Sequence, residues 1–337
     1  QRPKRQATTH GNSSQQNTSG SRNEASISYT FNINEGINVY NYEQLKATLE
    51  GADYNGQIVN IVVLDKPTTT AYNYEYGYDL VPSFALKAKE EQTFANLTSE
   101  KLGSISVYNK NVYLNGNQHK IDLTNVRNFT NEEYTTLGWS QDVIDPALEI
   151  THSIGGLQLD VKLYDLTILG NCSIDYQGDL SGKTPVGAYY IGLSIGNPKQ
   201  DIFSAYFLDC QNVTLAQLNT GMRVYHVVNN GLVKNINVYN CFGNGIESYS
   251  NIITFENMTF GPCGAAGIEI VPDYDREAGT SFNQQQQVTF AGSITTTNYS
   301  NGNSLYMQNF NAGGVGVMTI LQGVFSQYPD EVLSNIR

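Results

Sequence analysis

Apolar and polar positions recur at a fixed spacing in the second half of the chain. The segments "YDLTIL", "QNVTLA", "KNINVY" and "ENMTFG" align, and their second, polar column comprises Asp165, Asn212, Asn235 and Asn257. The steps between these residues are 47, 23 and 22, so the first step covers two periods. A period of 22 to 24 residues built from short strands is typical of one coil of a parallel β-helix. The pattern therefore predicts coils that stack at the ordinary strand spacing of about 4.8 Å.

Three apolar columns flank the polar column and predict the inward side chains of each coil. They comprise Leu163, Cys210, Val233 and Phe255; Leu166, Val213, Ile236 and Met258; and Ile168, Leu215, Val238 and Phe260. Asn and Asp tolerate the left-handed backbone region and hydrogen-bond locally, so their column predicts a ladder of side chains in a turn. Three glycines recur before the following strand, at steps of 24 and 22: Gly221, Gly245 and Gly267.

Before these coils, "NYEQLKATLEGA" has the spacing of an amphipathic helix. Leu45, Leu49 and Ala52 fall on one face, and Asn41 stands where an N-cap is expected. The next segment, "GQIVNIVVLDKP", predicts a buried strand that ends in a turn. We therefore expect an all-β fold, a right-handed parallel β-helix (β-solenoid) with a short N-terminal capping helix.

The domain organisation follows from where the apolar residues begin. Residues 1–27 contain almost no large apolar side chain, so burial cannot offset the entropy of ordering them. We predict a disordered linker rich in Ser, Thr, Asn and Gln over residues 1–27. A single β-solenoid ligand-binding domain is expected over residues 28–337.

Composition and charge narrow the class of protein. Only 15% of the residues are charged, against roughly 25% in average proteins. This uncharged polar composition favours an extracellular β protein. The net charge of −12 argues against nucleic acid as a partner, because that binding depends on Lys and Arg at phosphates. No apolar run approaches the roughly 18 residues of a membrane span, so we expect no membrane insertion. No long apolar or coiled-coil trimerisation segment is visible in the sequence either, so we expect a monomer.

The cysteines fit the repeat better than they fit a metal site. Cys241 and Cys263 occupy the same position in neighbouring coils, and Cys210 fills an apolar column. We therefore predict three small, reduced core residues rather than metal ligands or a disulfide. Cys172 falls one place off the column, and the repeat does not explain it.

A repeated motif, Cys-x-x-x-Gly-Ile-Glu, places two carboxylates in one column. Glu247 and Glu269 follow inward isoleucines, so alternation directs both outward. Arg223 occupies the same column one coil earlier. The pattern predicts that the three side chains follow one another along one outer face. We expect an exposed ion pair between Arg223 and Glu247, worth about 0 to 1 kcal/mol.

Two inserted segments and this column supply the candidate binding residues. Trp139 is the only tryptophan, and "VPDYDREAG" contains Tyr274 and Arg276. An exposed aromatic ring can stack on a pyranose, and a guanidinium can hold a uronate carboxylate with two hydrogen bonds. We predict Trp139 and Tyr274 as stacking surfaces and Arg223 and Arg276 as carboxylate-binding residues. The alternative for Trp139 is that it packs its loop onto the coil.

The helix "NYEQLKATLEGA" before "IVNIVVLDKP", followed by Asn-punctuated coils, resembles the pectate-lyase-like adhesive domains of Gram-positive surface proteins. It is similar to the binding region of the serine-rich repeat adhesins of gut lactobacilli. The Ser-rich segment that precedes such regions matches residues 1–27. The resemblance covers roughly residues 28–337. It implies a β-solenoid that binds pectin-type polysaccharide or host mucus and epithelium without catalysis. It also implies a place on the bacterial cell surface, anchored to the cell wall through parts outside this sequence.

The alternative is a polysaccharide lyase or hydrolase. Pectate lyases of the same fold use clustered carboxylates to hold Ca²⁺ and an arginine as base. Here the corresponding residues would be Glu247, Glu269, Asp273, Asp275 and Arg276. Only the first two share a column, and the chain lacks the Asp-Asp and Gly-His-Gly motifs of polygalacturonase-type hydrolases. His226, the one histidine inside the repeat region, is predicted to be structural. A phage-tail or purely structural solenoid is a third possibility.

These observations together predict a non-catalytic adhesin module that binds acidic polysaccharide. We expect no cofactor and no metal. Because the protein is acidic, it repels a polyuronate at neutral pH, and protonation of Asp and Glu relieves that repulsion while Arg stays charged. Binding is therefore expected to strengthen as the pH falls toward about 4 to 5.

Overall fold

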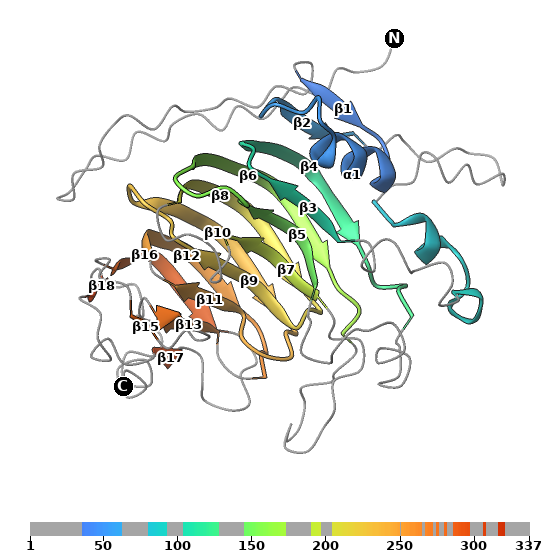
Figure 1. The fold of residues 1–337 in the computed structure, drawn as a ribbon. Helices are drawn as coiled ribbons and strands as arrows, with labels where there is room; N and C mark the ends of the chain where they lie inside the picture. Colours follow the sequence, from blue (N-terminus) through green and yellow to red (C-terminus); the bar gives the residue numbers. More distant parts are fainter. Residues whose placement is uncertain are drawn as a thin grey trace, which may run out of the picture.

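The computed structural model describes most of the repeat region and separate segments on either side of it. The described residues are 36–62, 80–92, 104–127, 145–172, 190–196, 204–249, 251–264, 267–271, 274–275, 280–281, 286–296, 306–307 and 316–320. The predicted linker over residues 1–27 lies outside them. The described part is mostly β, with two sheets of stacked parallel strands (Figure 1). This architecture is compatible with the predicted β-helix.

The chain alternates between the two sheets, so that strands adjacent in one sheet come from successive coils. Within the described residues, sheet A has the order β1 (Ile37–Val39), β2 (Ile58–Ile61), β4 (Val112–Asp122), β6 (Gln158–Leu169), β8 (Ala205–Ala216), β10 (Gly231–Tyr239), β12 (Ile252–Phe260), β16 (Gln286–Thr296) and β18 (Gly316–Ile320). Sheet B has the order β3 (Ile105–Tyr108), β5 (Asp145–Thr151), β7 (Tyr190–Ile195), β9 (Thr220–Tyr225), β11 (Ile246–Tyr249), β13 (Ile268–Val271) and β17 (Tyr306–Met307). A short antiparallel pair joins β14 (Tyr274–Asp275) and β15 (Thr280–Ser281).

The predicted polar column is present as a ladder of side-chain hydrogen bonds. Nδ2 of Asn212 donates to Asp165 at 2.9 Å, Asn235 donates to Asn212 at 3.0 Å, and Asn257 donates to Asn235 at 3.2 Å. All four backbones have positive φ, between 54° and 57°. We call these four residues the asparagine ladder. Asn and Asp are the side chains that best tolerate this conformation, which explains their recurrence.

The ladder residue resets the alternation of side chains within each long strand. Leu163 and Leu166 are both buried, although regular alternation would place residues three apart on opposite faces. The left-handed residue between them, Asp165, shifts the pattern by one position. Both halves of the strand therefore bury their apolar side chains on the same side.

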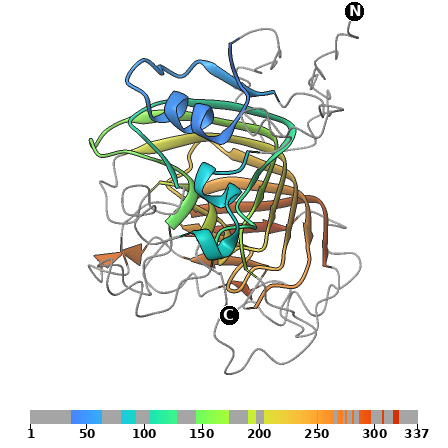
Figure 2. The ribbon, with the colours of Figure 1, turned by 90° about the vertical axis from the view of Figure 1, so that its right-hand side faces the viewer.

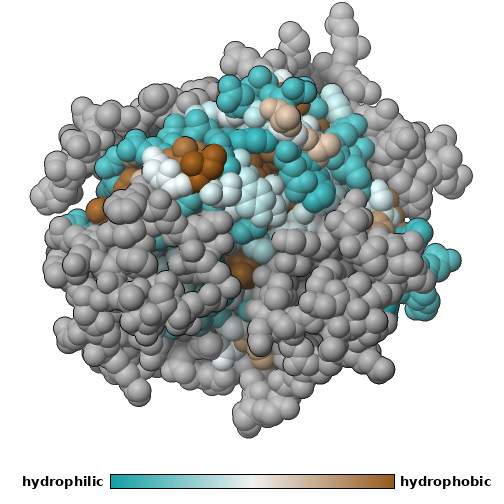
Figure 3. Space-filling view, viewed as in Figure 1, coloured by the Kyte–Doolittle hydropathy of each residue, from teal (hydrophilic) through white to brown (hydrophobic). Residues whose placement is uncertain are grey.

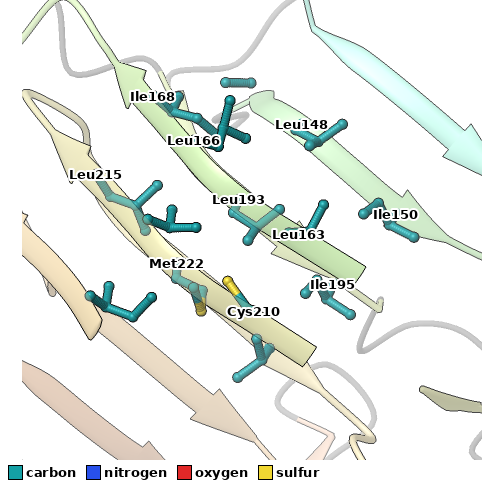
Figure 4. Packing of buried hydrophobic residues seen from close by; sticks show 14 of the residues in the cluster. Leu148, Ile150, Leu163, Leu166, Ile168, Leu193, Ile195, Cys210, Leu215 and Met222 are labelled. Carbon is teal, nitrogen blue, oxygen red and sulfur yellow. The ribbon is translucent and has the colours of Figure 1, made fainter. Parts of the chain in front are cut away.

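The predicted inward columns form the core. The side chains of the three apolar columns are almost fully buried. Figure 4 shows side chains of sheet A, such as Leu163 and Leu215, and of sheet B, such as Leu148 and Leu193, pointing into the space between the sheets. The described surface visible in Figure 3 is mostly hydrophilic, and its hydrophobic areas are small. No helix among the described residues is long and apolar enough to cross a membrane.

The predicted helix forms and lies at one end of the stack (Figure 2). Helix α1 (Tyr42–Glu50) begins after Asn41, whose side chain accepts a hydrogen bond from the Gln44 backbone at 2.9 Å. Leu45 and Leu49 are buried, as predicted. The prediction for Ala52 was wrong, because the helix ends at Glu50 and Ala52 is exposed. Two short 3₁₀ helices, Ser83–Leu86 and Lys89–Glu91, follow.

Side chains of α1 also complete the free edge of sheet B. The first strand, β3, has no strand partner beyond it among the described residues. Instead, the Ser106 N–H donates to the Glu50 carboxylate at 2.8 Å, and the Ser104 carbonyl accepts from Lys46 at 2.6 Å. Lys46 and Glu50 pair with each other at 2.9 Å. The cap therefore satisfies edge groups that would otherwise be open to another chain.

The cysteine and glycine predictions also agree with the structure. All four cysteines are buried and reduced, and Cys241 and Cys263 face each other in neighbouring coils. The hydrogen bond between the two thiols, which favours the protonated form of Cys241, and the burial of Cys241 both raise the pKa of its thiol. At Gly221 and Gly245, a Cβ atom would meet a carbonyl oxygen of the next coil at 2.5 Å. The recurring glycines therefore permit the close approach of successive coils.

Candidate functional site

The candidate site lies on the outer face of sheet B. Strand register places Ser106, Glu149, Ser194, Arg223, Glu247 and Glu269 opposite one another in successive strands. We call these residues the polar row. The predicted order of Arg223, Glu247 and Glu269 along one outer face is thereby confirmed.

The predicted ion pair forms, but the expectation that it is exposed was wrong. Nε of Arg223 lies 2.7 Å from Oε2 of Glu247, and the two side chains are 27% and 10% exposed. Three further side chains surround the Glu247 carboxylate. Tyr249 donates at 3.0 Å, Asn244 at 3.2 Å and Thr220 at 3.5 Å. Alternation shows which face a side chain takes, but it does not show what surrounds it there.

The electrostatics of the pair fix both charges. Burial alone would raise the pKa of Glu247, but the Arg223 charge and the hydrogen bonds from Arg223, Asn244 and Tyr249 hold it below its usual value. Burial lowers the pKa of Arg223, but Glu247 together with the neighbouring Tyr225 and Tyr249 raises it above its usual value. The guanidinium is therefore positioned by Glu247 and remains charged over the whole physiological range.

A pair of tyrosines that the sequence prediction did not include lies beside the ion pair. Tyr225 and Tyr249 follow Arg223 and Glu247 by two residues, so alternation places them on the same outer face. Their rings stack with centroids 4.6 Å apart and an angle of 14° between planes. Both residues are only 5% exposed. The repeated Tyr two places after the charged column was a signal in the sequence that could have revealed this pair.

The other predicted binding residues are not placed by the structure. Trp139 and Arg276 lie outside the described residues, and only the backbone of Tyr274 is described, in β14. Of the four predicted binding residues, Arg223 alone is seen with its contacts. The structure thus joins Arg223 to Glu247 and the tyrosine pair.

The carboxylates of the lyase alternative have partners of their own where they are described. Glu247 pairs with Arg223, and Glu269 accepts a hydrogen bond from Asn244 at 2.6 Å. Asp273 lies outside the described residues, and for Asp275 only the backbone is described. Within the described part of the chain, no three His, Cys, Asp or Glu residues come together in a way that could hold a metal ion.

His226 is buried at the end of β9, as expected of a structural residue. Its carbonyl accepts a hydrogen bond from the Tyr206 N–H at 3.0 Å, and its N–H donates to the Tyr249 carbonyl at 3.3 Å. Only 3% of the residue is exposed. These contacts tie the end of β9 to β8 of sheet A and to β11, its neighbour in sheet B.

Comparison with known proteins does not assign the chain to a family. It matches no protein-family model, no curated protein and no solved structure.

Proposed function

We propose that this chain is a non-catalytic, cell-surface adhesin module that binds acidic polysaccharide and, through it, host mucus or epithelium. Its fold is a right-handed parallel β-helix. One observation carries the binding function. Arg223 is fixed by Glu247 in an outward row, and 27% of its side chain remains exposed beside two stacked tyrosines.

A guanidinium held in this way suits a uronate carboxylate. The hydrogen bond to Glu247 uses Nε, which restricts the orientation of the planar group before a ligand arrives. A positioned guanidinium loses less freedom on binding than an unrestrained one. The in-register row also continues over several coils, so a linear polymer can contact the same face along its length.

Equilibrium binding to polygalacturonate and to a neutral polysaccharide, at pH about 4 and about 7, tests this function. We expect binding of the polyuronate that strengthens at the lower pH. Arg223→Lys keeps the positive charge beside Glu247 but removes the planar fork, so it should weaken this binding about tenfold. Lys89→Gln, which removes an exposed charge elsewhere, should leave it unchanged.

Two results would contradict the proposal. Equal affinity of Arg223→Lys and the wild type for polygalacturonate would remove Arg223 from the site. If incubation with polygalacturonate and Ca²⁺ produced the ultraviolet absorbance of unsaturated sugar ends, the protein would be a polysaccharide lyase and not a non-catalytic adhesin.

A further inference from the structure

The second half of sheet A presents an outer face that differs from the polar row. One outward column lies two residues after the asparagine ladder in β6, β8, β10 and β12 and continues into β16. It consists of Thr167, Thr214, Asn237, Thr259 and Thr295. We call it the threonine column. Each of its members is exposed or half-buried. The same column is present in the aligned segments of the sequence, as the residue two places after the ladder position.

Three of the five members of this column have polar groups that the described part of the fold does not use. Thr167, Thr214 and Asn237 make no side-chain hydrogen bond within the described part of the chain. Only Thr259 and Thr295 contact each other, at 3.3 Å. In the neighbouring asparagine ladder, by contrast, every amide is engaged with the next coil. The column therefore offers hydroxyl and amide groups to a ligand.

An exposed aromatic ring stands beside this column. Tyr239 follows Asn237 by two residues on the same face of β10 and is 37% exposed. Its register partner in β8 is Ala216, and Gly261 lies on the other side, where a Cβ atom would meet the Tyr239 Cβ at 2.5 Å. Because both neighbours are small, their side chains cannot cover the ring. The stacked Tyr225 and Tyr249, at 5% exposure, present no such surface.

This face is uncharged from β6 to β16. In these strands neither the threonine column nor the row of Tyr239 contains a charged residue, whereas in β4 the two rows continue into Lys120 and Asp122. The nearest charges beyond the ladder, Lys234 and Glu256, pair with each other at 3.1 Å. In a protein of net charge −12, such a face neither attracts a cation strongly nor repels a neutral ligand.

We infer that the threonine column and Tyr239 form a second binding face, for a neutral linear glycan that runs along the coil stack. A pyranose has an apolar ring face that can stack on Tyr239, and hydroxyls that exchange hydrogen bonds with Thr and Asn. A polymer of such rings can meet the same groups again in each coil, at intervals of about 4.8 Å. This face shares no residue with the proposed polyuronate site.

The test measures binding of neutral hexasaccharides of β-1,4-linked glucose, mannose and galactose by calorimetry, with the matching disaccharides. We expect at least one hexasaccharide to bind, and to bind more tightly than its disaccharide because it spans several coils. Its affinity should not change between about 0.05 M and about 0.5 M NaCl, since no charge pair is involved. Tyr239→Ala should weaken it about tenfold, and Thr214→Val, which keeps the branched shape, about threefold.

Arg223→Lys serves as the matched control and should leave hexasaccharide binding unchanged. Both Tyr239 and Thr214 are outward, so their variants should retain the wild-type thermal unfolding midpoint. Failure of every hexasaccharide to bind at millimolar concentration would overturn the inference, and so would full affinity in Tyr239→Ala. Neither result bears on polygalacturonate binding through Arg223, so the two proposals can fail independently.

Discussion

At the scale of single residues, Asn235 shows how one position can supply both backbone and side-chain stability. Its φ is 55°, and its amide both donates to Asn212 and accepts from Asn257. Asn235→Ala should lower the free energy of unfolding by about 2 to 4 kcal/mol, from left-handed strain and two lost hydrogen bonds. Asn235→Gly also loses both hydrogen bonds, but glycine tolerates the left-handed backbone without strain. It should therefore be about 1 kcal/mol more stable than Asn235→Ala. Urea unfolding measures both, and equal stability of the two variants would show that strain is not part of the cost.

The pair of Arg223 and Glu247 gives a second prediction at this scale. Because the folded protein lowers the pKa of Glu247, its stabilising contribution is complete above the unfolded value of about 4.3. This contribution is lost as the pH falls through the lower pKa that Glu247 has in the folded protein. At pH 7, Arg223→Ala should lower the free energy of unfolding by about 2 kcal/mol, a value between those measured for exposed and for buried ion pairs.

The thermal midpoint of Glu247→Gln, measured from pH 7 to pH 3, checks the sign. Its difference from the wild type should narrow as the pH falls below about 4.3, because the unfolded wild-type chain then takes up a proton at Glu247 that the folded protein binds only at lower pH. A difference that stays constant over this range would mean that the folded protein does not lower the pKa of Glu247.

At the scale of elements, α1 protects the end of sheet B. Lys46→Ala together with Glu50→Ala would leave the Ser104 carbonyl and the Ser106 N–H of β3 without their side-chain partners. We expect concentration-dependent self-association through this edge, with a loss of about 1 to 2 kcal/mol in stability. Sedimentation velocity measures the association. The matched pair Lys89→Ala and Glu90→Ala, exposed in a 3₁₀ helix, should remain monomeric under the same conditions.

The elements also show what could be predicted from sequence. Asn212 and Asn235 could be placed because few side chains tolerate left-handed backbone, and because stacked coils repeat at a near-constant length. The pairing of Arg223 with Glu247 followed from the same register. The end of α1 before Ala52 could not be placed, because helix ends depend on a single turn of backbone at Gly51. Nor could the burial of Glu247, which depends on contacts from Asn244 and Tyr249 rather than on the pattern of its own strand.

At the scale of the whole molecule, the net charge of −12 sets how a polyuronate approaches. If long-range repulsion limits binding at pH 7, added NaCl should strengthen it there, because about 0.1 M salt screens charges beyond about 10 Å. Salt should then reproduce part of the gain that acid produces. At pH about 4 the repulsion is already reduced, so the same salt should weaken binding by screening the contact at Arg223.

If the proposed function is right, added salt therefore strengthens binding at pH about 7 and weakens it at pH about 4. This change of sign arises from the charge of the whole protein and not from one residue. Titrating polygalacturonate at several NaCl concentrations, at pH about 4 and about 7, measures both. Arg223→Lys should bind more weakly but show the same change of sign in its salt dependence, since it preserves the net charge of the molecule. Salt that weakens binding equally at both pH values would mean that local attraction governs at neutral pH as well. In that case, acid strengthening would have to arise from a carboxylate at the site and not from the field of the whole molecule.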